Sequence, residues 1–175
     1  MPDFAYRLAR LAISLSALGA LSACANLSQV PPGAPLGDVV SQFGRPNFEC
    51  DRPDGTHRVI WTTQPAGQFA WGTDLTSDGR TKQVVPIFTD AYFKQHLAVG
   101  MTAEQVHCEF GPPAEISGVG LPSVRQTVWA YRYKQSGVWN SLMYVYMGAD
   151  GNHVTRFHPG PDPRYDEDRF WRCGG

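Results

Sequence analysis

The side chains that could carry enzymatic chemistry include five histidines and four cysteines. No two histidines have the His-x-x-x-His or His-Glu-x-x-His spacing of a metal site. The sequence also lacks a Gly-x-Ser-x-Gly nucleophile elbow and a phosphate-binding glycine loop. His107 and Cys108 are adjacent, but neighbours on a helix point about 100° apart, which argues against a nucleophile–base pair. We therefore expect a protein that is not an enzyme and that holds no metal and no cofactor.

The charged residues indicate neither a calcium site nor a nucleic-acid partner. Asp162, Asp166, Glu167 and Asp168 do not have the spacing of an EF-hand loop, so we expect a solvated acidic tail. The chain has 15 basic and 16 acidic side chains and a formal net charge of −1. A protein that binds the backbone phosphates of a nucleic acid would need a clear excess of basic side chains.

The first cysteine has a different chemistry, because it follows a secretion signal. Arg7 and Arg10 precede an uncharged run over residues 11–21, which has the length of a signal-peptide apolar region and is too short for a membrane span. The run ends in Leu-Ser-Ala-Cys24, the pattern of a bacterial lipobox, in which the thiol carries a diacylglycerol. Cleavage would remove residues 1–23 and leave Cys24 as a lipid anchor.

The residues after the lipobox predict the location of the protein. Residues 24–32 are small and polar with two prolines, which is typical of a flexible tether, here a lipidated one. Ala25 stands where an inner-membrane lipoprotein of a Gram-negative bacterium usually has Asp. We expect a protein that is lipid-anchored in the outer membrane and faces the periplasm.

The rest of the chain contains an internal repeat. Residues 33–46 align without gaps with residues 100–113, with matches at Gly, Val, Phe, Gly and Pro. Further matches follow in the same order, such as Val-Ile-Trp61 with Thr-Val-Trp129. The pattern indicates duplication. We expect one unit over residues 33–88, a second over 89–158 and a tail over 159–175.

Each unit should begin with helix. Thr102 and Gln105 form a capping box, Val106 and Phe110 share one face, and Gly111 followed by proline ends the helix. A second short helix is expected over residues 90–97. The first unit has proline at position 35, where the second has Thr102, so its helix start lacks the capping box.

Strands should follow the helices. The spacing predicts strands over residues 128–133, 142–147 and about 154–157, with a hairpin turn at Asp150-Gly151. The Pro-Gly-Pro-Asp-Pro run over 159–163 should not form a regular element. These elements predict an α+β fold of two tandem units, each with one or two short helices packed on a three- or four-stranded antiparallel sheet.

The strands of the second unit are unusually aromatic. In the strand expected over residues 128–133, alternation places Trp129, Tyr131 and Tyr133 on one face. The strand expected over residues 142–147 is apolar on both faces. The helix should cover one face of the sheet. The other is either covered by the tail or the other repeat, or it is a partner-binding surface. The residues concerned are Trp129, Tyr131, Tyr133, Tyr144 and Tyr146.

The remaining cysteines predict a disulfide, because the periplasm is oxidising. Cys108 lies two residues after Val106, on the opposite side of its helix from the buried stripe. A chain that crosses the outside of that helix could reach it. We favour a Cys108–Cys173 bond, with Cys50 as the rival partner.

The second unit carries a family resemblance. The segments Gly-Met-Thr-Ala-Glu-Gln-Val106, Phe-Gly-Pro-Pro113 and Trp-Ala-Tyr131 resemble the SmpA/OmlA family, the BamE-like lipoproteins of outer-membrane barrel assembly. Those proteins have one such unit, and a tandem pair resembles the β-lactamase inhibitor proteins. The resemblance implies an α+β unit with a scaffold or binding role, and it assigns no binding residues.

Two functions follow as hypotheses. The first is a non-enzymatic protein-binding or scaffold module that is anchored to the membrane by its lipid and binds a protein of the envelope, in outer-membrane protein assembly or envelope maintenance. The alternative is a periplasmic inhibitor or ligand-binding protein that uses a concave aromatic sheet surface.

Overall fold

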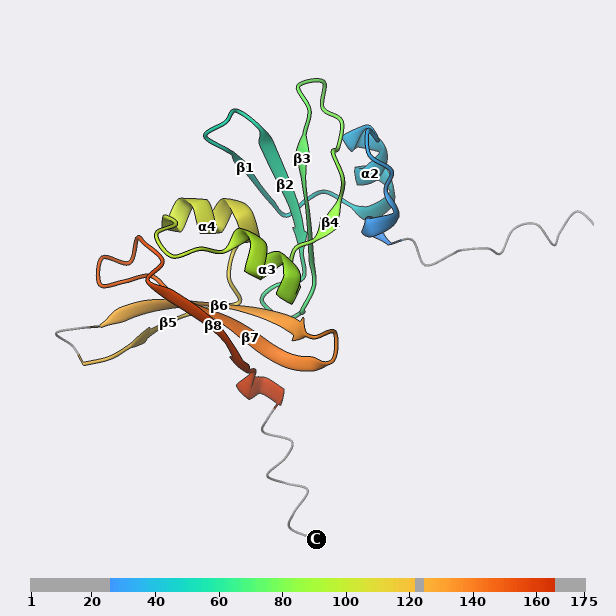
Figure 1. Ribbon diagram of the computed structural model, residues 1–175. Coiled ribbons are helices and arrows are strands. Elements are labelled where there is room, and N and C mark those ends of the chain that lie inside the picture. The colour runs from blue at the N-terminus through green and yellow to red at the C-terminus, as the bar shows by residue number, and fades with distance from the viewer. Residues whose placement is uncertain (1–25, 122–124, 166–175) are drawn as a thin grey trace, which may run out of the picture.

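The computed structural model describes residues 26–121 and 125–165, which form two four-stranded antiparallel sheets and a few short helices (Figure 1). The first sheet has the strand order β1-β2-β3-β4 and the second β5-β6-β7-β8. The α+β class with two tandem units is thus confirmed. The first unit comprises η1 (Leu27–Gln29), α2 (Leu36–Phe43), β1 (Phe48–Asp51), β2 (His57–Thr62), β3 (Ala70–Leu75) and β4 (Val85–Pro86).

The second unit has a similar plan with longer strands. Two helices precede four strands, in the same order as in the first unit. The helix expected over residues 90–97 is confirmed as α3. The elements are α3 (Asp90–His96), α4 (Ala103–Phe110), β5 (Glu115–Val119), β6 (Gln126–Gln135), β7 (Trp139–Tyr146) and β8 (Arg156–Pro161).

The two units repeat in structure as well as in sequence, because equivalent backbone hydrogen bonds form in both. In each unit the segment before the helix pairs with the segment that follows the third strand, and the N–H donors differ by 67 positions. Equivalent bonds join Leu36 N to Gly79 O (3.2 Å) and Ala103 N to Asn152 O (2.8 Å), and likewise Gly33 N to Thr81 O (2.7 Å) and Gly100 N to Val154 O (2.8 Å).

The helix ends differ between the units as the sequence predicts. Thr102 and Gln105 form the capping box at the start of α4, and α2 begins after Pro35 with no side-chain cap. Both helices end at a glycine with positive φ, 82° at Gly44 and 74° at Gly111. Glycine adopts this conformation without the steric cost that a Cβ would impose.

The helices of the second unit lie between the two sheets, and α2 covers the other side of the first sheet (Figure 1). A large core therefore joins both units: Ile60 and Ile87 of the first pack with Phe93 and Phe110 of the helices, and with Tyr131 of the second sheet. A smaller core lies under α2 and contains Leu27, Val30, Val39, Val59, Trp61 and Val84.

Two expectations about the C-terminal part are wrong. The proline-rich run does enter a regular element, because β8 extends to Pro161. It is an edge strand, where a proline that cannot donate to a neighbour is tolerated. Asp162 is not solvated: it is buried and accepts a hydrogen bond from Arg132 Nε at 3.0 Å. The other three predicted tail carboxylates lie outside the described residues.

No helix among residues 26–121 and 125–165 is long and apolar enough to cross a membrane. The lipobox and Cys24 lie outside this range.

Candidate interaction site

Two of the five aromatic residues predicted to form a surface are buried, and the other three are partly exposed. Tyr131 and Tyr133 have no exposed surface and pack against Phe93 of α3, and Trp129 of the same face is half-buried beside His107. The Tyr131 hydroxyl donates to the carbonyl of Gly111 at 3.1 Å, and burial raises the pKa of Tyr131. The prediction of a binding surface is wrong for Tyr131 and Tyr133, because the helices between the sheets cover them, whereas Trp129 stays partly exposed.

Tyr144 and Tyr146 lie on the opposite face of the second sheet and stay half-exposed. The guanidinium of Arg156 lies 3.8 Å from the ring centroid of Tyr146, and the hydroxyl of Tyr146 lies 3.1 Å from Nε2 of His158. Burial raises the pKa of Tyr144. These two tyrosines therefore remain part of an accessible face, held by contacts within their own sheet.

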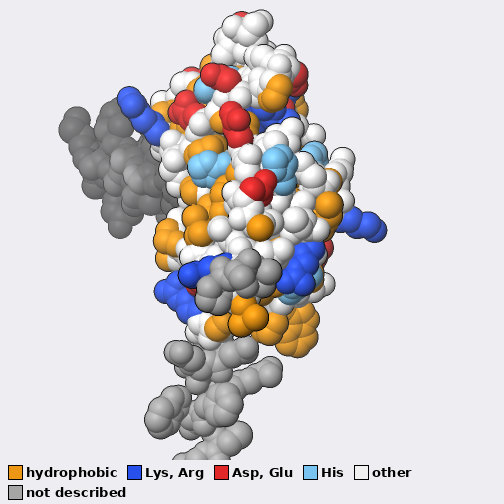
Figure 2. Space-filling view, turned by 90° about the vertical axis from the view of Figure 1, so that its left-hand side faces the viewer, with side chains coloured by type: hydrophobic (Ala, Val, Ile, Leu, Met, Phe, Trp, Pro, Cys, Tyr) orange, Lys and Arg blue, Asp and Glu red, His pale blue; other side chains and the backbone are white. Residues whose placement is uncertain are grey.

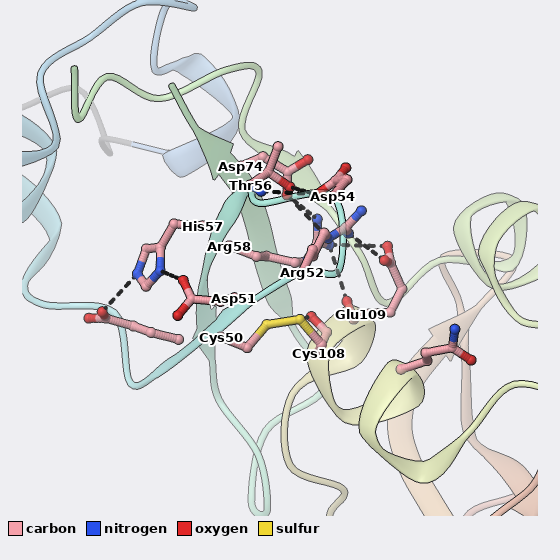
Figure 3. The surroundings of a disulfide bond; sticks show 12 residues. Cys50, Asp51, Arg52, Asp54, Thr56, His57, Arg58, Asp74, Cys108 and Glu109 are labelled. Carbon is pink, nitrogen blue, oxygen red and sulfur yellow. Dashed lines mark hydrogen bonds and ion pairs between the residues drawn. A yellow bond between two sulfur atoms is a disulfide. The ribbon is translucent and has the colours of Figure 1, made fainter. Parts of the chain in front are cut away.

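The disulfide joins Cys50 of β1 to Cys108 of α4, with their Cα atoms 5.7 Å apart (Figure 3). The preferred Cys108–Cys173 pairing is therefore wrong and the rival pairing is right; Cys173 itself lies outside the described residues. Helical geometry placed Cys108 away from Val106 correctly. The chain that crosses that side of α4 is β1 of the other unit, so the bond links the two repeats.

A network of buried charges lies beside this disulfide (Figure 3). Arg58 of β2 donates from Nη2 to the Tyr92 hydroxyl at 2.7 Å and to the Glu109 carbonyl at 3.1 Å, and from Nη1 to Asp74 at 3.2 Å. The Glu109 carboxylate accepts from both Arg52 and Tyr92. Burial raises the pKa of Tyr92. Because these bonds join residues of the first unit to Tyr92 and Glu109 of the second, the network links the two units.

The contact region between the two units, which we call the seam, also contains a groove away from the disulfide. This groove is the strongest candidate for a binding site. We call it the seam groove; its volume is about 320 Å³. It lies between β3–β4 and the turn that joins β6 to β7, which forms the right-hand end of the second sheet in Figure 1. Its lining residues are Phe69, Ala70, Trp71, Pro86, Phe88, Thr89, Asp90, Lys134 and Gly137.

Large apolar side chains at and beside the seam groove are open to solvent. Phe69 is 52% exposed, and Val138 and Trp139, which follow Gly137 directly, are 66% and 62% exposed. The rings of Phe69 and Trp71 stack with their centroids 6.1 Å apart. Exposed aromatic side chains of this kind are typical of a surface that binds another molecule.

The elements around the seam groove hold it in one shape. Asp90, at the start of α3, accepts a hydrogen bond from the backbone N–H of Ser136 at 2.6 Å and another from the Tyr133 hydroxyl at 3.0 Å. Across the seam, the amide of Gln68 donates to Asn140 at 3.0 Å. The β6–β7 turn is thus tied to both units, and its aromatic neighbours need little ordering when a partner binds.

Sequence reasoning missed this site. A signal was present, since Val138 and Trp139 follow directly after Ser136-Gly137 in a hairpin turn, where apolar residues have no core to enter. The location of Phe69 beside them could not be predicted, because it depends on how the two sheets meet. Lys134 and Asp90 give the groove a polar rim, and the described residues include no cluster of metal-ligating side chains.

Comparison with known protein families finds no match, the SmpA/OmlA family included, and comparison with curated proteins finds no significant relative. Among solved structures, the chain is similar to a "putative beta-lactamase inhibitor protein" from Streptococcus mutans. The TM-score is 0.30 and the identity 12%, over 77% of this chain and 87% of that chain. We therefore base the function on the contacts and exposure of this chain's own residues.

Proposed function

We propose that this chain is a non-enzymatic protein-binding module whose contact site is the seam groove. The observation that carries this proposal is the exposed Phe69 in the groove, stacked on the partly buried Trp71, with the exposed Trp139 two residues after the lining residue Gly137. Aromatic anchors of this type, placed on a rigid support, supply most of the affinity in protein interfaces. The paired and buried charges elsewhere at the seam favour a structural role for that region over a catalytic one.

The lipobox supports the second part of the proposal, namely that the module is tethered to the outer membrane and faces the periplasm. The motif ends at Cys24, before the described residues begin. In this setting the partner would be a protein of the envelope, and outer-membrane protein assembly or envelope maintenance would be the process served. Membrane fractionation tests the anchor: the Cys24→Ser variant should leave the outer-membrane fraction, and its retention there would contradict the proposal.

Partner recovery with matched variants tests the binding site. Wild-type protein and Phe69→Ala should be used as baits on solubilised envelope, with Val99→Ala as the control. Phe69 lines the seam groove and is 52% exposed, whereas Val99 is 66% exposed and is not among the lining residues. We expect one or a few proteins that Val99→Ala retains and Phe69→Ala loses, with affinity reduced at least about tenfold, as for a hot-spot residue. Equal recovery by both variants would reject the seam groove as the contact site.

Inhibition of a periplasmic enzyme is the second candidate. The observation that favours it is the position of the aromatic groove between two units that are firmly joined. A rigid surface formed by both units loses little conformational entropy when it binds an enzyme, which favours tight inhibition. Titration of the protein into a β-lactamase assay is the direct test. Inhibition that Phe69→Ala weakens would support this function, and an unchanged rate at saturating protein would reject it for that enzyme class.

A further inference from the structure

The two sheets have four edge strands, and three of them are protected against pairing with another strand. β8 contains Pro159 and Pro161, which have no N–H to donate. β4 is two residues long and includes Pro86. β1 carries the charged Glu49 and Asp51. Proline, charge and shortness are the usual means by which proteins keep sheet edges from associating.

The fourth edge, β5, is the least protected of the four. All five of its residues are exposed, and Ile116 and Val119 are exposed by 65% and 40%. It contains no proline and one charged residue, Glu115, which is paired with Arg132 of the adjacent strand. In the described part of the chain no strand lies on its outer side. Alternate residues of such an edge direct their N–H and C=O groups outward, where they can pair only with another extended chain.

We propose that β5 pairs with β5 of a second copy of this chain, antiparallel and across a twofold axis at Ser117, so that the two second sheets become one continuous sheet. A twofold axis through Ser117 places Glu115 opposite Val119 of the second copy and Ile116 opposite Gly118. No like charges then face each other, and the apolar side chains gain cover. The pairing is self-complementary, which is what a twofold interface requires.

The charge distribution around this edge is compatible with a second copy. Figure 2 views the side of the molecule on which α4 and the left-hand end of β5 lie in Figure 1. Acidic side chains gather in its upper part, and its lower part carries hydrophobic side chains among basic ones. Because β5 belongs to the second sheet, in the lower part, two copies joined there keep their acidic regions apart.

The oligomeric state of the mature chain in detergent tests this proposal. Sedimentation should show a dimer, and Ile116→Lys should weaken its association at least tenfold, because two lysines would be placed in the pairing. Val99→Lys is the matched control, since Val99 is 66% exposed and distant from β5 in sequence. A wild-type monomer at all concentrations, or a dimer that Ile116→Lys leaves intact, would overturn the proposal. Binding of β5 to a segment of another protein would give the first of these results.

Cysteine cross-linking tests the register. In a Cys173→Ser background, Ser117→Cys should give a disulfide-linked dimer under mild oxidation, because the twofold axis places this residue beside its own copy. Ser77→Cys, an exposed residue in a turn of the first unit, should stay monomeric on a non-reducing gel. Equal cross-linking at both positions would mean random collision and would overturn the proposed pairing.

Discussion

Helices α2 and α4 occupy equivalent positions in the two repeats, yet their surroundings differ. α2 lies on the outer side of the first sheet over a small core, with Val39 as its buried residue. α4 lies between the two sheets, buries Val106 and Phe110 completely, and is bonded through Cys108 to the first unit. The two units thus have a similar plan, but their assembly makes one helix central and leaves the other peripheral.

The strand that packs on each helix shows the same relation. In the first unit, Trp61 donates from its indole N–H to the carbonyl of Gly44 at 2.9 Å; in the second, the Tyr131 hydroxyl donates to Gly111 at 3.1 Å. Both bonds satisfy a carbonyl at the helix C-terminus, which has no partner within the helix. The carbonyl at the end of the helix is thus bonded by a strand side chain in both units, by Trp61 in the first and by Tyr131 in the second.

Truncation of the equivalent phenylalanines should give the largest difference between the helices. Phe110→Ala removes a ring with no exposed surface that packs on Phe93 and Tyr131, and should cost about 3–5 kcal/mol of unfolding free energy. Phe43, at the same repeat position in α2, is only partly buried, and Phe43→Ala should cost less than about half as much. Urea denaturation measures both. Equal losses would contradict the central position of α4.

Removal of the disulfide should have the next largest effect. Cys50 and Cys108 are 58 residues apart, and a loop of this length lowers the entropy of the unfolded chain by an amount worth roughly 4 kcal/mol in the loop-closure model. The Cys50→Ala/Cys108→Ala double variant should therefore lose about 2–4 kcal/mol. Non-reducing peptide mapping checks the bond directly, and Cys173→Ser serves as the control. A Cys173-containing bridge would contradict the structure.

The capping box should contribute less. Thr102 accepts from the backbone N–H of Gln105 at 3.1 Å, and the Gln105 side chain accepts from the Thr102 N–H at 2.8 Å. Thr102→Ala should cost about 1 kcal/mol, and Thr102→Ser, which keeps the hydroxyl, should cost little. Thermal denaturation distinguishes the two. If both variants matched wild type, the cap would not contribute to holding α4 in place.

The repeat, the capped helix and the hairpin turn could be predicted because each depends on residues close together in sequence. Thr102 and Gln105 are one helical turn apart, and the Asp150-Gly151 pair lies within the turn between β7 and β8 that it predicts. Alternation likewise placed Tyr131 and Tyr133 on one face.

Which face the helices and the first unit cover could not be predicted, because that depends on how the elements assemble. Tyr131 packs with Phe88, which lies before α3, and the same assembly brings Cys50 to Cys108 and Phe69 to the β6–β7 turn. Alternation defines which side chains share a face and carries no information about the neighbour. The seam is therefore where sequence reasoning failed, and it holds both the disulfide and the seam groove.

The smallest expected effect concerns pH, and it has opposite signs in the two units. Hydrogen bonds to Asp51, and then to Glu49, raise the pKa of His57 in β2. The native state then binds the proton more tightly than the unfolded state. The stabilisation is complete below the ordinary histidine pKa of about 6.5 and is lost as pH rises through the raised value.

His107 of α4 should respond in the opposite way. Its ring lies between Phe48 and Trp129, and burial lowers its pKa. The unfolded state takes up the proton first, so the stability present above about pH 6.5 falls as pH decreases toward the lowered pKa. Urea denaturation at about pH 5 and about pH 8 should show that His107→Gln removes an acid-side loss, whereas His57→Gln removes an acid-side gain. If the two substitutions shifted the pH dependence in the same direction, the contrast between an open histidine in the first unit and an enclosed one in the second would be wrong.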